Sequence, residues 1–400
     1  MNLRSGHPYW LLKNGLMAEY PALKADARAE VAIIGGGITG ALVADALTEA
    51  GMDCLLVDKR DIGTGSTAAS TSILQYEIDT PLAELIGKVG EEHAVRAYRL
   101  GLEAIDRIEA LTTELKDDCG FERRDSWYMA SKPRHVAALR EEFEARRRHG
   151  FSVELLNEDE VRARSTLGAP AAIVSHGNAR IDAYRLTHLL IQRAMRGGLR
   201  VYDRTDVLKF EHTDDGTLLE TDRGVSITAR KVIVAAGYES QTYLKQNVGN
   251  LNSTFAVASE PLDSFVGWPD RAIVWETARP YFYLRDTPDG RAIIGGVDHP
   301  FSTAHRRDRL VERRTRRLVR KFQSLFPAID FEVSYAWAGT FGETKDGLAY
   351  IGQTPERPDT YFALGYGGNG ITWSVIAARI ITDLYLGRPN PDAAIFRFDR

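Results

Sequence analysis

The sequence predicts an α/β fold, α+β overall, with a domain built on a parallel sheet and a second domain built on a mixed sheet. Three observations predict this. Residues 30–57 have the pattern of an apolar strand, a glycine turn, a helix and a second apolar strand, which together form a βαβ unit. A buried strand at 231–235 and a strand, glycine loop and helix at 361–386 repeat this type of pattern. Between them, residues 254–300 hold short aromatic and β-branched runs typical of a mixed or antiparallel sheet.

The two patterns alternate along the chain, so we expect each domain to be assembled from discontinuous segments. The domain with the parallel sheet is predicted to comprise residues 28–90, 155–245 and 338–400, and the second domain residues 91–154 and 246–337, after an N-terminal lead-in of residues 1–27. Helical periodicity predicts helices at 38–50, 79–118, 134–149, 185–196, 304–326 and 371–386. Asp214-Asp-Gly, between two strand-like runs, predicts a hairpin turn.

The composition argues against several classes of function. The 400 residues carry a net charge of −4, which gives no general attraction to nucleic acid or anionic membranes. The two cysteines, Cys54 and Cys119, are far apart, and the nine histidines lack metal-binding spacing, so we expect no disulfide framework and no metal. No apolar run is long enough for a signal peptide or a membrane span, and we expect a cytoplasmic protein.

The first glycine motif directly follows the strand that begins at residue 30. Its residues are Gly35, Gly36, Gly37, Ile38, Thr39 and Gly40. The missing side chains let the backbone approach a pyrophosphate, and the helix N-terminus offers N–H groups and a positive dipole end. Asp58 ends the next strand and can accept hydrogen bonds from a ribose 2′-hydroxyl. The unit predicts a Rossmann-like dinucleotide site; the alternatives are a purely structural turn and an acid that only caps a turn.

Three further segments favour FAD over NAD. Small and hydroxyl residues at 64–71 suit a loop beside a flat ligand and its phosphates, and the strand at 232–237 ends in small residues that could pass beneath a nucleotide. Residues 365–372 place a second glycine turn before a helix, whose dipole would stabilise an anionic reduced flavin. The first segment could instead be a flexible loop and the last a glycine-rich connection. The predicted FAD contacts in and near these segments are Lys59, Gly65, Ser66, Thr67, Ser70, Thr71, Val207, Ala236, Gly237, Gly367, Gly368, Asn369, Gly370, Ile371 and Thr372.

Together the motifs EVAIIGGGITG, GTGSTAASTS, RIDAYRL, KVIVAAG, WAGTFGETKDGLAYIG and ALGYGGNGITWS resemble the D-amino-acid oxidase superfamily of flavoproteins in order and spacing. The likeness is closer to the branch of glycine oxidase, sarcosine oxidase and γ-glutamylputrescine oxidase, which residues 256–262 and 394–400 also resemble. The resemblance implies a sheet-based substrate domain over the flavin ring. It also implies hydride transfer to flavin N5 from a C–H bond next to nitrogen or oxygen.

The carboxylate-binding residues of that branch have no counterpart here. Aligned with glycine oxidases, Phe341 and Gly368 stand where two arginines occur, and aligned with sarcosine oxidases, Gln75 and Thr372 replace an arginine and a lysine. We therefore expect glycine and sarcosine to be poor substrates. Some sarcosine oxidases attach their flavin through a late cysteine, and no cysteine follows Cys119, so we expect FAD to be non-covalent.

The segment 279–285 is the candidate substrate site. At strand spacing, Tyr281, Tyr283 and Arg285 share one face. Two phenols and a guanidinium could bind an acidic or polar substrate, with Arg285 the first candidate to meet a carboxylate and Arg279 the second. The alternative is an aromatic core strand with Arg285 at its solvated end.

These observations predict an FAD-dependent oxidoreductase that takes a hydride from a small amine or amino acid. The electrons would pass to an acceptor such as oxygen, a quinone or a protein. An alternative is a 2-hydroxyacid or polyol-phosphate dehydrogenase. A less favoured one is a flavin-dependent tRNA-modifying enzyme, supported only by the basic run at 306–321. Apolar residues on one face of that run indicate a solvated helix instead, and we expect no nucleic-acid partner.

Overall fold

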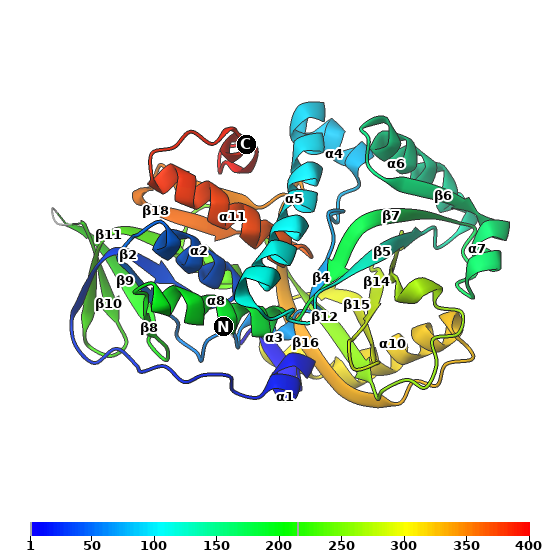
Figure 1. The fold of residues 1–400 in the computed structure, drawn as a ribbon, viewed down its shortest axis with the longest axis horizontal. Helices are drawn as coiled ribbons and strands as arrows, with labels where there is room; N and C mark the ends of the chain where they lie inside the picture. Colours follow the sequence, from blue (N-terminus) through cyan, green and yellow to red (C-terminus); the bar gives the residue numbers. More distant parts are fainter. Residues whose placement is uncertain (1, 214–215) are drawn as a thin grey trace.

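The structure is a computed structural model that describes residues 2–213 and 216–400. Two sheets lie side by side in Figure 1, with helix α5 (Glu91–Leu115) standing between them. Within the described residues, the smaller sheet has eight strands and the larger sheet has ten. The prediction of an α/β protein with a mixed second sheet is confirmed.

The smaller sheet holds the predicted βαβ unit. Its order is β17 (Tyr350–Thr354), β18 (Arg357–Leu364), β11 (Ser226–Val234), β2 (Ala27–Ile34), β3 (Cys54–Val57) and β8 (Arg200–Tyr202), with the hairpin β9 (Val207–Thr213) and β10 (Gly216–Thr221) attached to β11. The strands from β18 to β8 run parallel. The two aspartates of the predicted hairpin turn at 214–216 lie outside the described residues.

Both faces of this sheet are covered, which explains its continuous apolar strands. In β2, Val31 and Ile33 join the core under α2 (Ile38–Glu49), α8 (Ala183–Arg196) and α11 (Gly370–Tyr385). Ala32 and Ile34, on the alternate face, join a second core with residues of β9 to β11.

The larger sheet is mostly antiparallel. Its order is β1 (Arg4–Gly6), β16 (Val333–Glu343), β12 (Asn250–Ser259), β15 (Ala292–Pro300), β14 (Phe282–Asp286), β13 (Ile273–Glu276), β5 (Glu122–Met129), β7 (Ala171–Arg180) and β4 (Ile73–Leu74), with β6 (Val153–Asn157) beside β7. Helix α10 (Val311–Leu325) buries Leu318 and Phe322 in the core that it shares with this sheet. The remaining α-helices in the described residues are α1 (Tyr9–Asn14), α3 (Ser66–Ala69), α4 (Leu82–Val89), α6 (Val136–Arg148), α7 (Glu158–Arg164) and α9 (Ala304–Asp308).

Two long predicted helices are each divided in the structure. The one at 79–118 becomes α4 and α5, because Gly90 takes a left-handed φ of 85° between them. The one at 304–326 becomes α9 and α10.

The predicted domain segments do not follow the sheets. Strands β4 and β7 belong to the larger sheet although their residues were assigned to the nucleotide-binding domain, and β16 crosses the expected boundary at 337/338. Helix α5, assigned to the second domain, packs its buried side chains into the core beneath α2 and α11. Local periodicity reveals a strand but not the sheet that it joins.

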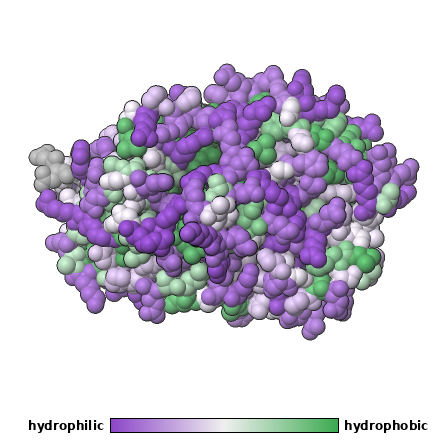
Figure 2. Space-filling view, in the orientation of Figure 1, coloured by the Kyte–Doolittle hydropathy of each residue, from purple (hydrophilic) through white to green (hydrophobic). Residues whose placement is uncertain are grey.

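Figure 2 shows a mainly hydrophilic face on which hydrophobic residues gather in small patches. No helix in the described part of the chain is both long and apolar enough to cross a bilayer.

Candidate active site

One cavity of about 500 Å³ extends between the two sheets. This volume is in the range of small-molecule and cofactor sites. The turn between β2 and α2, the loop after β3, the end of β11 and the start of α11 line its nucleotide end. The opposite end is lined by residues of the larger sheet, which we call the sheet wall: Thr254, Trp275, Tyr281, Tyr283, Asp298 and Phe341.

The glycine turn brings backbone to the cavity because side chains are absent there. Gly35 has a φ of 110°, and a Cβ on it would lie 2.4 Å from the Ala235 carbonyl oxygen. Gly35, Gly37, Ile38 and Thr39 line the cavity. The first-turn N–H groups of α2 have no acceptor within the helix, so an anionic group can use them. The turn fits a dinucleotide pyrophosphate.

Two residues of the motif predicted as cofactor contacts, Gly36 and Gly40, are closely packed within the turn. Neither Gly36 nor Gly40 lines the cavity. A Cβ on Gly40 would lie 1.8 Å from the Gly35 carbonyl oxygen, and one on Gly36 would lie 2.2 Å from Ile62 Cδ1. Both glycines therefore allow the close approach that shapes the turn.

Asp58 lies at the edge of the cavity beside this turn. Its carboxylate accepts hydrogen bonds from the Gly36 N–H (2.7 Å) and the Arg60 N–H (2.7 Å). Burial raises the pKa of Asp58 above its usual range. Next to it, Lys59 and Arg60 form ion pairs with Glu239, each at 2.8 Å. The remaining acceptor capacity of Asp58 suits a ribose hydroxyl.

Residues 64–71, which we call the hydroxyl-rich loop, pack against the start of α2. The N–H of Ile38 donates to the Thr67 hydroxyl at 3.0 Å. Gly65, Ser66, Thr67, Ser70 and Thr71 line the cavity, as do Lys59, Val207, Ala236 and Gly237 further along it.

Helix α11 begins at the cavity, where Gly367, Gly368, Asn369, Gly370 and Ile371 lie in its lining. The Asn369 amide donates to the carbonyl oxygens of Gln75 (3.1 Å) and Glu77 (2.8 Å), which fixes the loop after β4 to this helix. Thr372 is not in the lining; its hydroxyl donates to the Asn369 carbonyl oxygen at 2.9 Å. The start of the helix offers N–H groups and a positive dipole end, which suit the negative edge of a reduced flavin.

The sheet wall places Tyr281 and Tyr283 in the cavity. The Tyr281 hydroxyl donates to Asp79 Oδ1 at 2.5 Å, and the N–H of Gly368 donates to Asp79 Oδ2 at 3.0 Å. The Tyr283 hydroxyl lies 3.3 Å from the Thr254 hydroxyl. Burial and hydrogen bonding to Asp79 contribute to raising the pKa of Tyr281 well above that of a free phenol.

A bulge in β15 accompanies Asp298 at this wall. Ser253 pairs with His299 and Phe255 with Gly296, so the register shifts around Val297, whose φ is 53°. A bulge re-aims the neighbouring side chain, and left-handed backbone is unfavourable for a β-branched residue. Burial, followed by the repulsion of Asp79, raises the pKa of Asp298 to about 7.

Arg285 does not lie in the cavity lining, which corrects its prediction as the substrate-binding arginine. Its side chain is buried rather than solvated, and burial lowers its pKa to about 9. The guanidinium donates to the carbonyl oxygens of Thr71 (3.1 Å), Ser72 (2.8 Å), Ile181 (2.9 Å) and Asp286 (2.7 Å). It therefore ties the loop after α3 to two neighbouring segments.

Arg279, the second candidate, is exposed and is also absent from the cavity lining. Its guanidinium donates to the carbonyl oxygens of Ala278 (3.2 Å) and Asp79 (3.0 Å).

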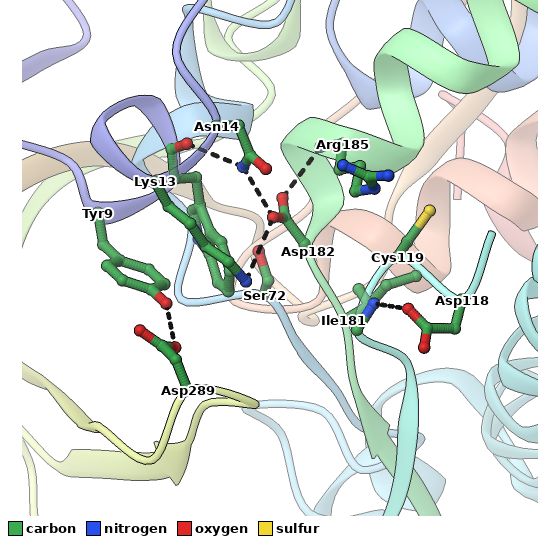
Figure 3. Close-up of polar contacts among 12 residues, drawn as sticks. Tyr9, Lys13, Asn14, Ser72, Asp118, Cys119, Ile181, Asp182, Arg185 and Asp289 are labelled. Carbon is green, nitrogen blue, oxygen red and sulfur yellow. Dashed lines mark hydrogen bonds and ion pairs between the residues drawn. The ribbon is translucent and has the colours of Figure 1, made fainter. Parts of the chain in front are cut away.

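The N-terminal lead-in forms part of the site. Arg4 donates to the Thr64 carbonyl oxygen at 2.6 Å, and the Trp10 indole donates to that of Ser70 at 2.7 Å. Figure 3 shows Asn14 and Lys13 directed toward Asp182, with the Asn14 amide 2.8 Å from it. The lead-in thus holds the hydroxyl-rich loop from outside.

Sequence reasoning missed Asp79, Glu239, Trp275 and Asp298. One signal could have drawn attention to the sheet wall, because paired glycines inside a strand mark a close approach. A Cβ on Gly295 would lie 2.6 Å from the Tyr283 ring, so a glycine at this position of β15 leaves room for that ring.

Comparison with known proteins agrees with this geometry. The family described as "FAD dependent oxidoreductase" (DAO) matches residues 30–384. Glycine oxidase of Bacillus subtilis (strain 168) is 25% identical over 93% of this chain and 97% of its own length. Gamma-glutamylputrescine oxidoreductase of Escherichia coli (strain K12) is 25% identical over 95% of this chain and 88% of its own length.

A solved structure has the same fold. The crystal structure of glycine oxidase from Geobacillus kaustophilus superimposes with a TM-score of 0.77 and 22% identity, covering 94% of this chain and 99% of that one. Because the family match covers most of the chain and the residues of the cavity fit a flavin dinucleotide, the chain belongs to the DAO family of FAD-dependent oxidoreductases.

Proposed function

We propose that this chain oxidises a small amine or amino acid by removing a hydride from a carbon bonded to nitrogen, with FAD held non-covalently. The observation that carries the proposal is the continuity of one cavity. It joins the glycine turn and Asp58 to the start of α11 and to the aromatic side chains of Tyr281 and Tyr283. The names of the two curated relatives, which include glycine and a putrescine derivative, support a nitrogen-bearing substrate.

Bound FAD would supply the acceptor for the hydride and its two electrons. The residues of the chain position the donor. The rings of Tyr281 and Tyr283 form an apolar wall that excludes water from the reacting carbon. As the C–H bond breaks, the nitrogen lone pair forms the C=N bond of an iminium ion, so a neutral amine needs no separate base. The positive end of α11 favours the negative charge that develops beside it.

Non-covalent attachment is supported by the lining itself. In the described residues, no cysteine or histidine side chain lines the cavity, and both cysteines are buried elsewhere. We expect purified protein to be yellow and to release intact FAD on heat or acid denaturation. Flavin that stays on the denatured chain contradicts non-covalent binding.

Anaerobic flavin bleaching tests the substrate class. The FAD-loaded protein is mixed with amines, amino acids, 2-hydroxyacids and polyol phosphates, and absorbance of oxidised flavin is followed. We expect bleaching by at least one compound with a C–H bond next to nitrogen. Bleaching only by hydroxyacids or polyol phosphates contradicts the proposal. Reoxidation with oxygen, a quinone or a redox protein then identifies the electron acceptor.

A further inference from the structure

The sheet wall combines aromatic rings with carboxyl groups. The ring centroids of Tyr281 and Tyr283 are 5.8 Å apart, and those of Trp275 and Tyr281 are 6.4 Å apart. Asp79 and Asp298 lie in the same part of the lining. Aromatic faces and carboxylates both attract cations.

Basic side chains are placed elsewhere. In the described part of the chain, the basic residues that line the cavity are Lys59 and Arg60, and both pair with Glu239 at the nucleotide end. Arg279 donates to the Asp79 carbonyl oxygen and Arg285 to that of Ser72. Neither arginine is in the lining, but the Arg279 guanidinium lies 4.8 Å from the Tyr281 ring centroid. In the described part of the lining, a substrate carboxylate at the sheet wall would meet two acids and no guanidinium group, while Arg279 contacts the Tyr281 ring from outside the lining.

Asp298 is the acid whose charge is least balanced. Its Oδ1 atom is buried and has no hydrogen-bond partner within residues 2–213 and 216–400. A hydrogen bond with Thr254 lowers its pKa in part, but burial outweighs this effect. The charged groups that act on it or face it are Asp79 from the loop after β4, Glu343 of β16, Arg279 before β14 and Arg314 of α10. A buried carboxylate with an unused oxygen is costly unless a cation or a hydrogen-bond donor reaches it.

We propose that the sheet wall binds the ammonium group of an amine that requires no carboxylate, with Asp298 as the counter-ion and the ring of Tyr283 as the cation-binding face. The inference rests on the proposed amine oxidation, because the ammonium group belongs to the substrate. The bound ammonium must lose one proton to solvent before its nitrogen lone pair can form the C=N bond. It replaces the expectation that an arginine meets an acidic substrate. An ammonium N–H supplies the missing donor for Asp298 Oδ1 and the missing positive charge.

Binding of small ions to the FAD-loaded protein tests this site. The probes are propylammonium chloride, tetramethylammonium chloride and sodium acetate, followed by flavin absorbance and by calorimetry. We expect both cations to bind and acetate not to bind. Propylammonium remains charged between pH 8 and pH 5.5, whereas Asp298 gains a proton, so affinity should fall about tenfold to thirtyfold over this interval. Tighter binding of acetate, or no change with pH, overturns the inference.

Two charge-removing variants separate this site from general electrostatics. Asp298→Asn should weaken propylammonium binding at pH 8 by at least about tenfold and remove its pH dependence, while FAD content is unchanged. Glu343→Gln is the matched control, because Glu343 is exposed, lies outside the cavity lining and acts on Asp298 only through its charge. We expect it to change affinity by no more than about twofold. Equal effects of the two variants contradict a specific role for Asp298, and the pH dependence of the unaltered protein remains decisive should Asp298→Asn not fold.

The outcomes distinguish this inference from the proposed function. Cation binding through Asp298 without flavin bleaching by any amine leaves the site valid and refutes amine oxidation. Bleaching by amines with an affinity that is insensitive to Asp298 and to pH refutes the cation site and leaves amine oxidation valid.

Discussion

The nucleotide end of the cavity is made largely of backbone and balanced charges, whereas the sheet wall is made of side chains and leaves one acid without a full set of partners. At the nucleotide end, Asp58 accepts two N–H groups and Glu239 pairs with two basic residues. At the sheet wall, Asp298 Oδ1 has no partner in the described residues. The first arrangement suits an end that always holds the same cofactor. The second suits an end that must attract a ligand and release its product.

The largest expected effect concerns Arg285, which holds the loop after α3 and lies at neither end of the cavity. Arg285→Lys should lower the free energy of unfolding by about 2–4 kcal/mol, because a lysine cannot satisfy the buried carbonyl groups that the guanidinium reaches. Flavin bleaching per bound FAD should stay within about twofold at saturating amine. Chemical denaturation and anaerobic bleaching measure the two quantities. Unchanged stability with lost bleaching would restore Arg285 as a substrate residue.

The nucleotide end of the cavity is built largely from backbone, so its affinity for FAD should be very sensitive to added side chains. Gly37→Val should weaken FAD binding by about tenfold to a hundredfold, because a Cβ there would lie 3.0 Å from Thr67 Oγ1 and its methyl groups would enter the cavity. Gly87→Ala is the control, since a Cβ on that exposed helical glycine meets nothing within 4 Å. The ratio of flavin to protein absorbance gives the result. Full FAD occupancy in Gly37→Val would place the phosphates elsewhere.

The uncompensated charge of Asp298 at the sheet wall should lower the folding stability of the ligand-free protein. Because the pKa of Asp298 is raised to about 7 in the folded protein, the fold holds this proton more tightly than the unfolded chain does. Its ionisation therefore costs stability as the pH rises from about 4 through 7. Asp298→Asn should raise the melting temperature of the ligand-free protein by about 2 °C per kcal/mol regained at pH 8, and by less at pH 5. A variant that melts lower than the parent at pH 8 would show that the carboxylate is well compensated.

The smallest expected effect distinguishes the contribution of the Tyr283 ring from that of its hydroxyl group. Tyr283→Phe keeps the aromatic face and loses the hydroxyl with its 3.3 Å contact to Thr254, so propylammonium affinity should change less than about threefold. Tyr283→Ala removes the face and should cost about 0.5–2 kcal/mol of binding. Calorimetric titration of both variants makes the comparison. A large loss in the phenylalanine variant would assign the role to the hydroxyl.

The contrast between the two ends also explains what the sequence could predict. The nucleotide end uses residues that are neighbours in the chain, so the turn at Gly35, the acid at Asp58 and the start of α11 were each apparent from a local pattern. The sequence could not show which glycines line the cavity and which allow close packing, because the approach of Gly40 to Gly35 depends on the folded turn.

The sheet wall draws on strands whose neighbours are distant in the chain. Tyr281 and Tyr283 were found from strand alternation, but that alternation could not show that Arg285 lies behind Thr71. Asp79 and Asp298 come from a loop and a bulged strand, and only tertiary pairing brings them together. The same limitation led to the assignment of residues 73–74 and 171–180, which form β4 and β7 of the larger sheet, to the nucleotide-binding domain.

The pairing of β1 with β16 has a consequence for biosynthesis. Arg4 lies opposite Gly339, and the same N-terminal segment holds the loop that lines the cavity, which α11 then completes near the other end of the chain. A nascent chain that emerges at about 5–20 residues per second would need roughly 20–70 s between the appearance of β2 and that of α11. Throughout this interval, the dinucleotide turn has no finished binding site around it. Completion of the cofactor site therefore has to wait until α11 has been made, and the nascent polypeptide must first persist without its flavin.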